Sequence, residues 1–207
     1  MMIVYISGKN SQRGHLVPTL IKAGLCLSLL ADLTLMIDEI SAFMIGITIF
    51  LVVHVLYGIG LSMGSPVRDI SFSTNLGIKL LSVCLVGLCC FNLHYSWNLM
   101  PNRFLFTLNS LALLMMNIFA INRYQYTTQY SYYFMAVGAF LLTFSNHLLI
   151  MMKFSKLESQ MGHAATMLMY FSAQYLLMHG AMHHSNLQYK IDMYMKRNGS
   201  QIAPIKI

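Results

Sequence analysis

The stretch Leu16–Ile37, LVPTLIKAGLCLSLLADLTLMI, decides the class of this fold. An α-helix needs about 20 mostly apolar residues to cross the hydrocarbon core of a bilayer, and this stretch is long enough. Its ionisable side chains are Lys22, near one end, and Asp32, near the other. Lys22 can extend its ammonium group back to the interface, whereas Asp32 has no cation beside it in the sequence. The stretch therefore predicts a spanning helix with an acid inside it.

The composition of the whole chain agrees with a membrane protein. Of 207 residues, 57% are hydrophobic and 9% are charged, whereas a soluble domain has about 25% charged residues. Short polar links separate the apolar segments, so consecutive helices are expected to be antiparallel neighbours. We therefore predict an all-α polytopic bundle of six spanning helices. Besides Leu16–Ile37, the predicted spans are Ile40–Met63, Leu76–Trp97, Phe104–Ile121, Ser131–Met151 and Ala164–Met182.

The remaining segments flank one transmembrane domain, residues 16–184. Residues 1–15 do not have the pattern of a secretory signal peptide, so we expect insertion through the first spanning helix. Residues 185–207 form a polar, basic tail that we expect to be poorly ordered. The net charge of +7 lies in loops and tails, which excludes a nucleic-acid-binding function. The positive-inside rule then predicts that both termini are cytosolic.

The cysteines have neither metal-ligand spacing nor a disulfide framework. They are Cys26, Cys84, Cys89 and Cys90, and all lie inside apolar runs. We interpret them as small apolar side chains, and we expect neither a metal nor a cofactor.

An intramembrane polar site is the main functional prediction. An Asp at the centre of a spanning helix costs about 2.5–3.5 kcal/mol on insertion scales, so Asp32 must face a polar interior, be protonated, or both. Asn146, in LLTFSNHLLIM (141–151), lies in the fifth predicted span, which runs in the same direction as the first. Each residue is about five positions, or 7–8 Å, from the end of its span. We expect both to line one cavity. The alternative is that Asp32 is hydrated at the helix end.

A weak internal repeat points to the same site. LADLTLM (30–36) resembles FSNHLLI (144–150), and each precedes a helix with a central polar residue, His54 or Gln174. Two parallel helix hairpins of this kind could enclose a site between them. His54 shares a helix face with Tyr57. The alternative for His54 is a hydrogen bond between helices without any catalytic role.

Five motifs together resemble the membrane lysoplasmalogenases, the YhhN-like proteins. The first two are LLADLTL (29–35) and FMIGITIFLVVHVLY (43–57); the others are GAFLLTFSNH (138–147), Lys153-Phe154 and YFSAQ (170–174). The family pattern is a Gly-Asp pair, a Gly…Phe…His…Tyr helix, and a Ser-Asp…Asn-Lys/Arg-Phe…Tyr-Tyr-x-Ala-Gln signature. The order and spacing of the motifs carry the resemblance, which covers residues 16–180.

The resemblance implies an ether-bond hydrolase. Family members hydrolyse the vinyl ether bond of lysoplasmalogens, giving a fatty aldehyde and a glycerophospho-base, and two intramembrane aspartates carry the reaction. Protonation of a vinyl ether yields an oxocarbenium-like centre, so a neutral Asp as donor and an ionised partner as base suit this chemistry. The lipid substrate would enter from the bilayer. In a eukaryote, the endoplasmic reticulum membrane is the expected location.

This sequence departs from the family pattern at several positions. Asp32 matches the first aspartate, although Ala31 stands where the family has Gly. Asn146 occupies the second aspartate position, and Met152 replaces the Asn before the basic-Phe pair. An amide can form hydrogen bonds but cannot shuttle a proton. Two apolar helices usual at the family's N-terminus are also missing from the pattern, which leaves six spans where eight are expected. This predicts either a shortened, divergent member or a gene model that begins late.

Three functional hypotheses follow. The first is a divergent lysoplasmalogenase in which His54 or His147 replaces the missing acid or base. The second is a catalytically silent relative that binds lysolipid or a membrane partner. The third is a small transporter or channel in which Asp32 is a proton or cation site. Under the first hypothesis, the catalytic residues are Asp32, Asn146 and His54, and the substrate-binding residues are Tyr57, His147, Tyr170 and Gln174.

Overall fold

A computed structural model of the chain describes residues 2–63, 87, 102–125, 127–154 and 160–197. These residues form five α-helices and one short 3-10 helix, and they contain no strand. The third predicted span, Leu76–Trp97, lies outside the described residues. The helices are α1 (Met2–Leu35), α2 (Ile40–Ser62), α4 (Arg103–Asn122), η1 (Arg123–Gln125), α5 (Gln129–Phe154) and α6 (Gln160–Arg197).

The helices confirm the predicted all-α membrane bundle. Four of them are long and apolar enough to cross a bilayer, namely α2, α4, α5 and residues Leu16–Leu35 of α1. The predicted sixth span, Ala164–Met182, is helical throughout as part of α6. It is not among these four, and polar side chains such as Thr166, Gln174 and His179 interrupt its apolar sequence. The total of six spans therefore stays a prediction.

Helical structure extends beyond the predicted transmembrane domain, residues 16–184, at both ends, and that domain stays a prediction. The helix α1 begins at Met2, so most of the predicted N-terminal segment 1–15 is helical. The helix α6 continues to Arg197, although we expected poor order after His184. The physical reason is that a helix need not end where its apolar character ends. Neither Pro nor Gly occurs between residues 181 and 198, so nothing in the backbone chemistry ends α6 earlier.

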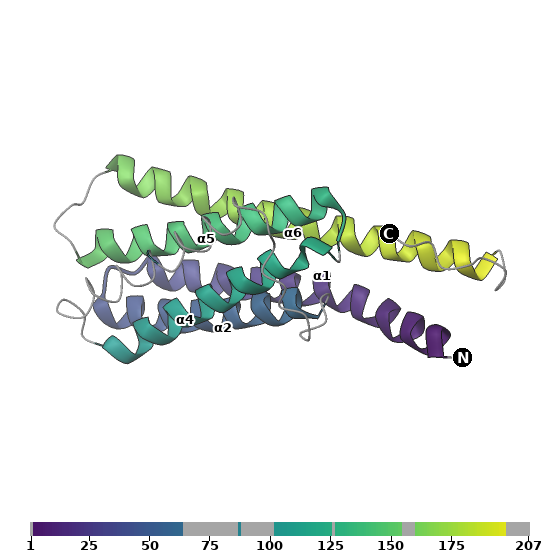
Figure 1. The fold of residues 1–207 in the computed structure, drawn as a ribbon. Coiled ribbons are helices and arrows are strands. Elements are labelled where there is room, and N and C mark those ends of the chain that lie inside the picture. The colour runs from purple at the N-terminus through teal and green to yellow at the C-terminus, as the bar shows by residue number, and fades with distance from the viewer. Residues whose placement is uncertain (1, 64–86, 88–101, 126, 155–159, 198–207) are drawn as a thin grey trace.

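The five helices close into a ring. Helix α1 packs against α2 and α6, α2 packs against α4, α4 against α5, and α5 against α6. Figure 1 shows α1 and α5 running in one direction and α2, α4 and α6 in the other, which confirms the predicted parallel pair. The start of α1 and the end of α6 lie at the same end of the bundle (Figure 1). That this end is cytosolic stays a prediction.

Close helix contacts and apolar packing hold the ring together. The main core cluster draws on α1, α2, α4, α5 and α6, and it includes Ile21, Tyr57, Met116 and Leu177. A Cβ added at Gly138 of α5 would lie 3.0 Å from the backbone nitrogen of Leu177, so this glycine lets α5 and α6 approach closely.

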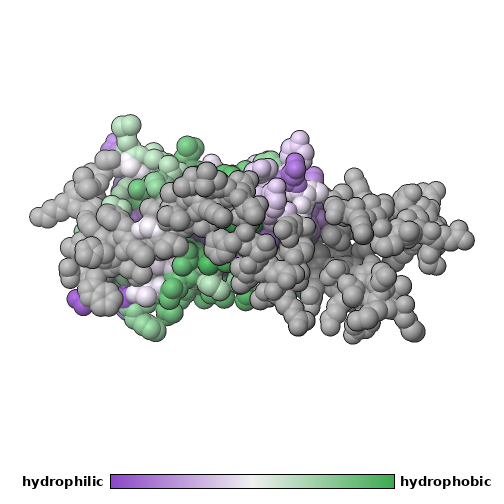
Figure 2. Space-filling model, in the orientation of Figure 1, coloured by the Kyte–Doolittle hydropathy of each residue, from purple (hydrophilic) through white to green (hydrophobic). Residues whose placement is uncertain are grey.

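The outer surface also suits a bilayer. Several large apolar side chains point outward, among them Leu29 (64% exposed), Phe104 (74%) and Leu168 (72%). Among the residues coloured in Figure 2, apolar side chains lie in the middle and polar ones lie toward either side. An apolar surface of this kind is expected to contact lipid.

Candidate functional site

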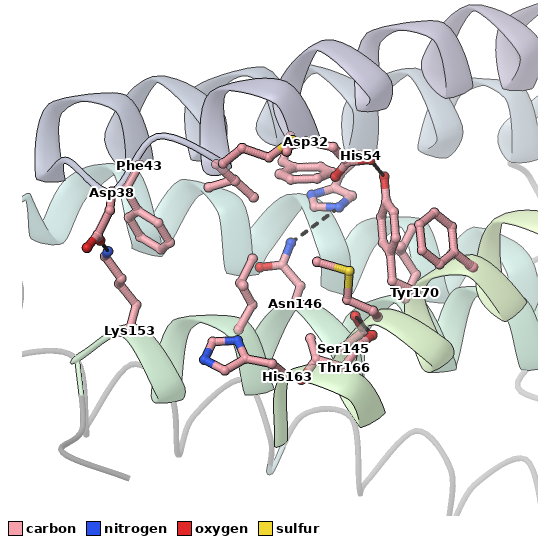
Figure 3. Close-up of a pocket in the computed structure, with 17 residues that line it drawn as sticks. Asp32, Asp38, Phe43, His54, Ser145, Asn146, Lys153, His163, Thr166 and Tyr170 are labelled. Carbon is pink, nitrogen blue, oxygen red and sulfur yellow. Dashed lines mark hydrogen bonds and ion pairs between the residues drawn. The ribbon is translucent and has the colours of Figure 1, made fainter. Parts of the chain in front are cut away.

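A cavity of about 540 Å³ opens between α1, α2, α5 and α6. Most of its lining is apolar, as is usual for ligand sites of this size. Asp32 and Asn146 both line it, as predicted. Figure 3 shows the polar side chains pointing into it from different helices. The polar or charged lining residues are Asp32, Asp38, His54, Ser145, Asn146, Lys153, His163, Thr166 and Tyr170.

Asp32 meets Tyr170 at one end of this cavity. Helix α1 places Asp32 one turn before its end at Leu35, and the side chain is half-buried. The hydroxyl of Tyr170, on α6, donates a hydrogen bond of 3.0 Å to Oδ2 of Asp32. One carboxylate oxygen is therefore held, and the carboxyl group still borders the cavity.

The predicted depth of the two residues needs a correction. Asp32 lies nearer the end of its helix than we expected, and Asn146 lies further from its own, because α5 continues to Phe154. The offsets were wrong because helix ends and apolar runs do not coincide. Helix α1 ends at Leu35, before the run ends at Ile37, whereas α5 continues past its run to Phe154.

A second polar group occupies the middle of the cavity. His54 of α2 is fully buried, and its Nδ1 lies 3.0 Å from Oδ1 of Asn109 on α4. Nδ2 of Asn109 donates a hydrogen bond of 3.4 Å to Oδ1 of Asn146 on α5. Nδ2 of Asn146 in turn lies 3.5 Å from Nε2 of His54. An Asn oxygen can only accept, so these contacts assign the proton to Nδ1 and leave the lone pair on Nε2.

Asn109 is the member of this group that sequence reasoning missed. It has no exposed surface. The available signal was the one that identified Asp32, because a strongly polar side chain inside an apolar helix has to find a partner. Asn109 lies five residues inside the predicted span Phe104–Ile121 and meets that criterion.

Tyr57 and Gln174 lie behind the cavity wall. The Tyr57 hydroxyl donates to Oε1 of Gln174 over 2.5 Å, and neither residue lines the cavity. The predicted role of Tyr57 and Gln174 in binding substrate would thus be indirect.

The two histidines proposed to replace a missing acid or base differ in position. His54 lines the cavity, whereas His147 is buried on α5 outside its lining. Of the two, only His54 is placed to contact a molecule in the cavity.

An ion pair lies at the other end of the cavity, opposite Tyr170 (Figure 3). Nζ of Lys153, at the end of α5, lies 2.6 Å from Oδ1 of Asp38, in the turn between α1 and α2. The hydrogen bond and the charge of Lys153 lower the pKa of Asp38 below its ordinary value of 3.8. Lys153 also lies over the ring of Phe43, with Nζ 5.9 Å from the centroid. Charged groups therefore gather at this end.

Polar contacts join the two helix hairpins that the repeat predicts, α1–α2 and α5–α6. Asp32 of α1 binds Tyr170 of α6, and His54 of α2 contacts Asn146 of α5. Phe50 and Tyr170, each four residues before the central polar residue of its helix, pack edge to face with centroids 5.9 Å apart. Corresponding positions of the two hairpins thus meet at the cavity.

The amino-acid sequence also matches a known protein family. The model of the YhhN family matches residues 1–181. The chain belongs to the YhhN family. No curated protein and no solved structure matches it.

For this YhhN protein, the cavity brings together some, though not all, of the positions in the resembled family pattern. Asp32, His54, Lys153 and Tyr170 line it together with Asn146, which stands at the second aspartate position. The Asn146 amide contacts both Asn109 and His54. Among the described residues, no group of three or more His, Cys, Asp or Glu side chains could hold a metal ion.

Proposed function

We propose that the protein hydrolyses the vinyl ether bond of a lysoplasmalogen, consuming one water and releasing a fatty aldehyde and a glycerophospho-base. The observation that carries this proposal is the Asp32 carboxyl group, held by Tyr170 at the edge of a largely apolar cavity. Vinyl ethers are hydrolysed by acid, and a carboxyl group in a desolvated site is a suitable proton donor. Membership of the YhhN family supports the proposal.

Asp32 can serve in both halves of the reaction. As a neutral acid it transfers its proton to the vinyl carbon remote from the ether oxygen, leaving an oxocarbenium-like centre beside the new carboxylate. The carboxylate stabilises that centre and then accepts a proton from the water that attacks it. The resulting hemiacetal collapses to aldehyde and alcohol. One carboxyl group is regenerated in each cycle, so this scheme needs no second aspartate.

The His54–Asn146 pair is suited to positioning the attacking water. Nε2 of His54 carries a lone pair toward Asn146, and both side chains line the cavity. A water inserted into this 3.5 Å contact, donating to Nε2 of His54 and accepting from Nδ2 of Asn146, would lie in the same cavity as Asp32. Asn109 fixes the tautomer of His54 through Nδ1, in the way that a carboxylate or carbonyl orients a catalytic imidazole.

The cavity lining also suits entry of a lipid from the bilayer. Met36, Met167 and Phe171 line the cavity and are 80%, 60% and 60% exposed. Apolar side chains that are exposed and also border the cavity offer an alkenyl chain an apolar route of entry. The route lies beside α1 and α6.

The test is aldehyde release by detergent-solubilised protein supplied with a 1-alkenyl lysophospholipid. We expect release by the wild type and none by Asp32→Asn. The matched control is Glu39→Gln, which neutralises an exposed acid outside the cavity and should leave the rate unchanged. Absence of release from both the wild type and Asn146→Asp would overturn the proposal.

A second candidate function, binding of lysolipid without hydrolysis, is favoured by the amide at Asn146. The saturated 1-alkyl analogue separates the two functions, because it has no double bond to protonate. An enzyme should bind the alkyl lipid and cleave the alkenyl one. A relative without catalytic activity should bind both the alkyl and the alkenyl lipid and cleave neither.

A further inference from the structure

The ion pair between Asp38 and Lys153 has features that a purely structural salt bridge does not need. The Asp38 side chain is 95% exposed and that of Lys153 is 29% exposed, yet both residues line the cavity. An exposed pair of this kind contributes only about 0–1 kcal/mol to stability. It can therefore be opened by a ligand at little cost.

The two charges lie where a polar end of a lipid would project. Along α5, Lys153 follows Asn146 by two helical turns, or about 10 Å at 1.5 Å per residue. The cavity lining runs from Tyr170 and Asp32, past His54 and Asn146, to Lys153 and Asp38 (Figure 3). A lysolipid whose sn-1 chain reached Asp32 would carry its sn-3 head group toward the ion pair.

The signs of the charges select one class of head group. A head group with only a phosphate would satisfy the ammonium of Lys153 but would meet the carboxylate of Asp38. A neutral glycerol head would satisfy neither charge. A zwitterionic head, with a phosphate and an amine a few bonds apart, can pair its phosphate with Lys153 and its amine with Asp38. No charge is then left without a partner.

We propose that Asp38 and Lys153 form a recognition site for a zwitterionic phospho-amine head group, with Lys153 on the phosphate and Asp38 on the ammonium. The inference rests on the proposed function, since it assumes that the cavity takes a lysolipid. Under the predicted topology, this site would lie on the non-cytosolic face. Phe43, which packs against Phe154, lies beneath Lys153 with its ring centroid 5.9 Å from Nζ.

The experiment measures binding of saturated 1-alkyl lysophospholipids to the full chain in detergent by native mass spectrometry, so that the readout does not depend on catalysis. The probes are lysolipids with a phosphoethanolamine head, a phosphate head, and no head beyond glycerol. We expect the wild type to bind the zwitterionic lipid about tenfold more tightly than the phosphate lipid, a difference of about 1.4 kcal/mol.

Two substitutions and two matched controls separate the roles of the charges. Asp38→Asn should remove the preference of the protein for the zwitterion over the phosphate lipid. Lys153→Met should weaken binding of both phosphate-containing lipids. The controls are Glu39→Gln and Lys22→Met, which remove exposed charges outside the cavity and should change neither affinity. Asp38 is almost fully exposed, so its substitution should leave the fold intact.

The outcomes distinguish this inference from the proposed function. Equal binding of the three lipids by the wild type would overturn the head-group site even if the alkenyl lipid were cleaved. An Asp38→Asn variant that keeps the full preference for the zwitterion would overturn it as well. Selective binding without any cleavage would support the head-group site and contradict the proposed hydrolysis.

Discussion

The Tyr170 hydroxyl donates to Oδ2 of Asp32 over 3.0 Å, and this contact joins α6 to α1 at the edge of the cavity. The Tyr170 ring also packs edge to face on Phe50 of α2. The carboxyl group of Asp32 therefore has a fixed orientation, although its own helix ends one turn later. An acid that must deliver a proton to carbon benefits from such orientation.

Replacing Tyr170 with Phe should lower kcat/KM for aldehyde release about tenfold. The ring packing stays, while the hydrogen bond to Asp32 is lost, and a bond to a charged group is worth about 1.5–3 kcal/mol. Tyr175→Phe, on the same helix and 67% exposed, is the control and should behave as the wild type does. An unchanged rate in Tyr170→Phe would show that Asp32 needs no such partner.

Gly24 should be far less tolerant of Ala than Gly60. A Cβ at Gly24 would overlap the Tyr57 ring, whereas one at Gly60 would meet its nearest neighbour at 3.4 Å, an ordinary contact. Ala is favoured over Gly within a helix by about 1 kcal/mol, and overpacking costs about 1–3 kcal/mol. We expect a lower Tm for Gly24→Ala and an unchanged or higher Tm for Gly60→Ala. The opposite order would contradict the packing of Tyr57 on α1.

Much of the fold could be predicted because hydropathy reports it directly. The predicted spans Ile40–Met63 and Phe104–Ile121 agree closely with α2 and α4. The extensions of α1 to Met2 and of α6 to Arg197 could not be predicted from apolar runs. Polar residues form helices as readily as apolar ones do, so the end of an apolar run marks the interface rather than the end of the helix.

The candidate site was partly predictable for a similar reason. Asp32 and Asn146 stood out because polar groups are costly in a bilayer, and both line the cavity. The partners could not be predicted, since the sequence does not say which face of each helix points inward. The contacts of Asn109 with His54, and of Tyr57 with Gln174, depend on helix rotation and packing. Their functional roles stay predictions.

His184 should make the protein less stable as the pH falls. Burial first, then the charge of Arg123 and then His183, lower the pKa of His184 from 6.5 to about 4. Between about pH 6.5 and pH 4, His184 is protonated in the unfolded chain but stays neutral in the folded chain. The free energy of unfolding therefore declines as the pH falls through this range, by up to roughly 3 kcal/mol. His184→Gln should flatten the fall of Tm between about pH 7 and pH 4.5. His179→Gln, an exposed control on α6, should not flatten it. An equal slope in wild type and His184→Gln would contradict this assignment.

Asn109 and His54 should behave as a coupled pair. In Asn109→Leu, the buried Nδ1–H of His54 loses its acceptor, and an unsatisfied buried donor costs about 1–3 kcal/mol. Once His54 is also Leu, the remaining cost of Asn109→Leu should be smaller, because no imidazole donor is left unsatisfied. Urea unfolding of the two single variants and the double variant therefore should show a coupling of about 1 kcal/mol or more.

The same substitution should also affect catalysis, because Asn109 fixes the tautomer that leaves the lone pair on Nε2 of His54. We expect aldehyde release per folded molecule to fall about tenfold or more in Asn109→Leu. The control is Asn117→Leu, on the same helix, which loses a hydrogen bond of 2.6 Å to Thr143 away from the cavity lining. It should lose stability but keep its activity. Additive costs in the cycle, together with equal activity in the two Leu variants, would show that Asn109 does not orient His54.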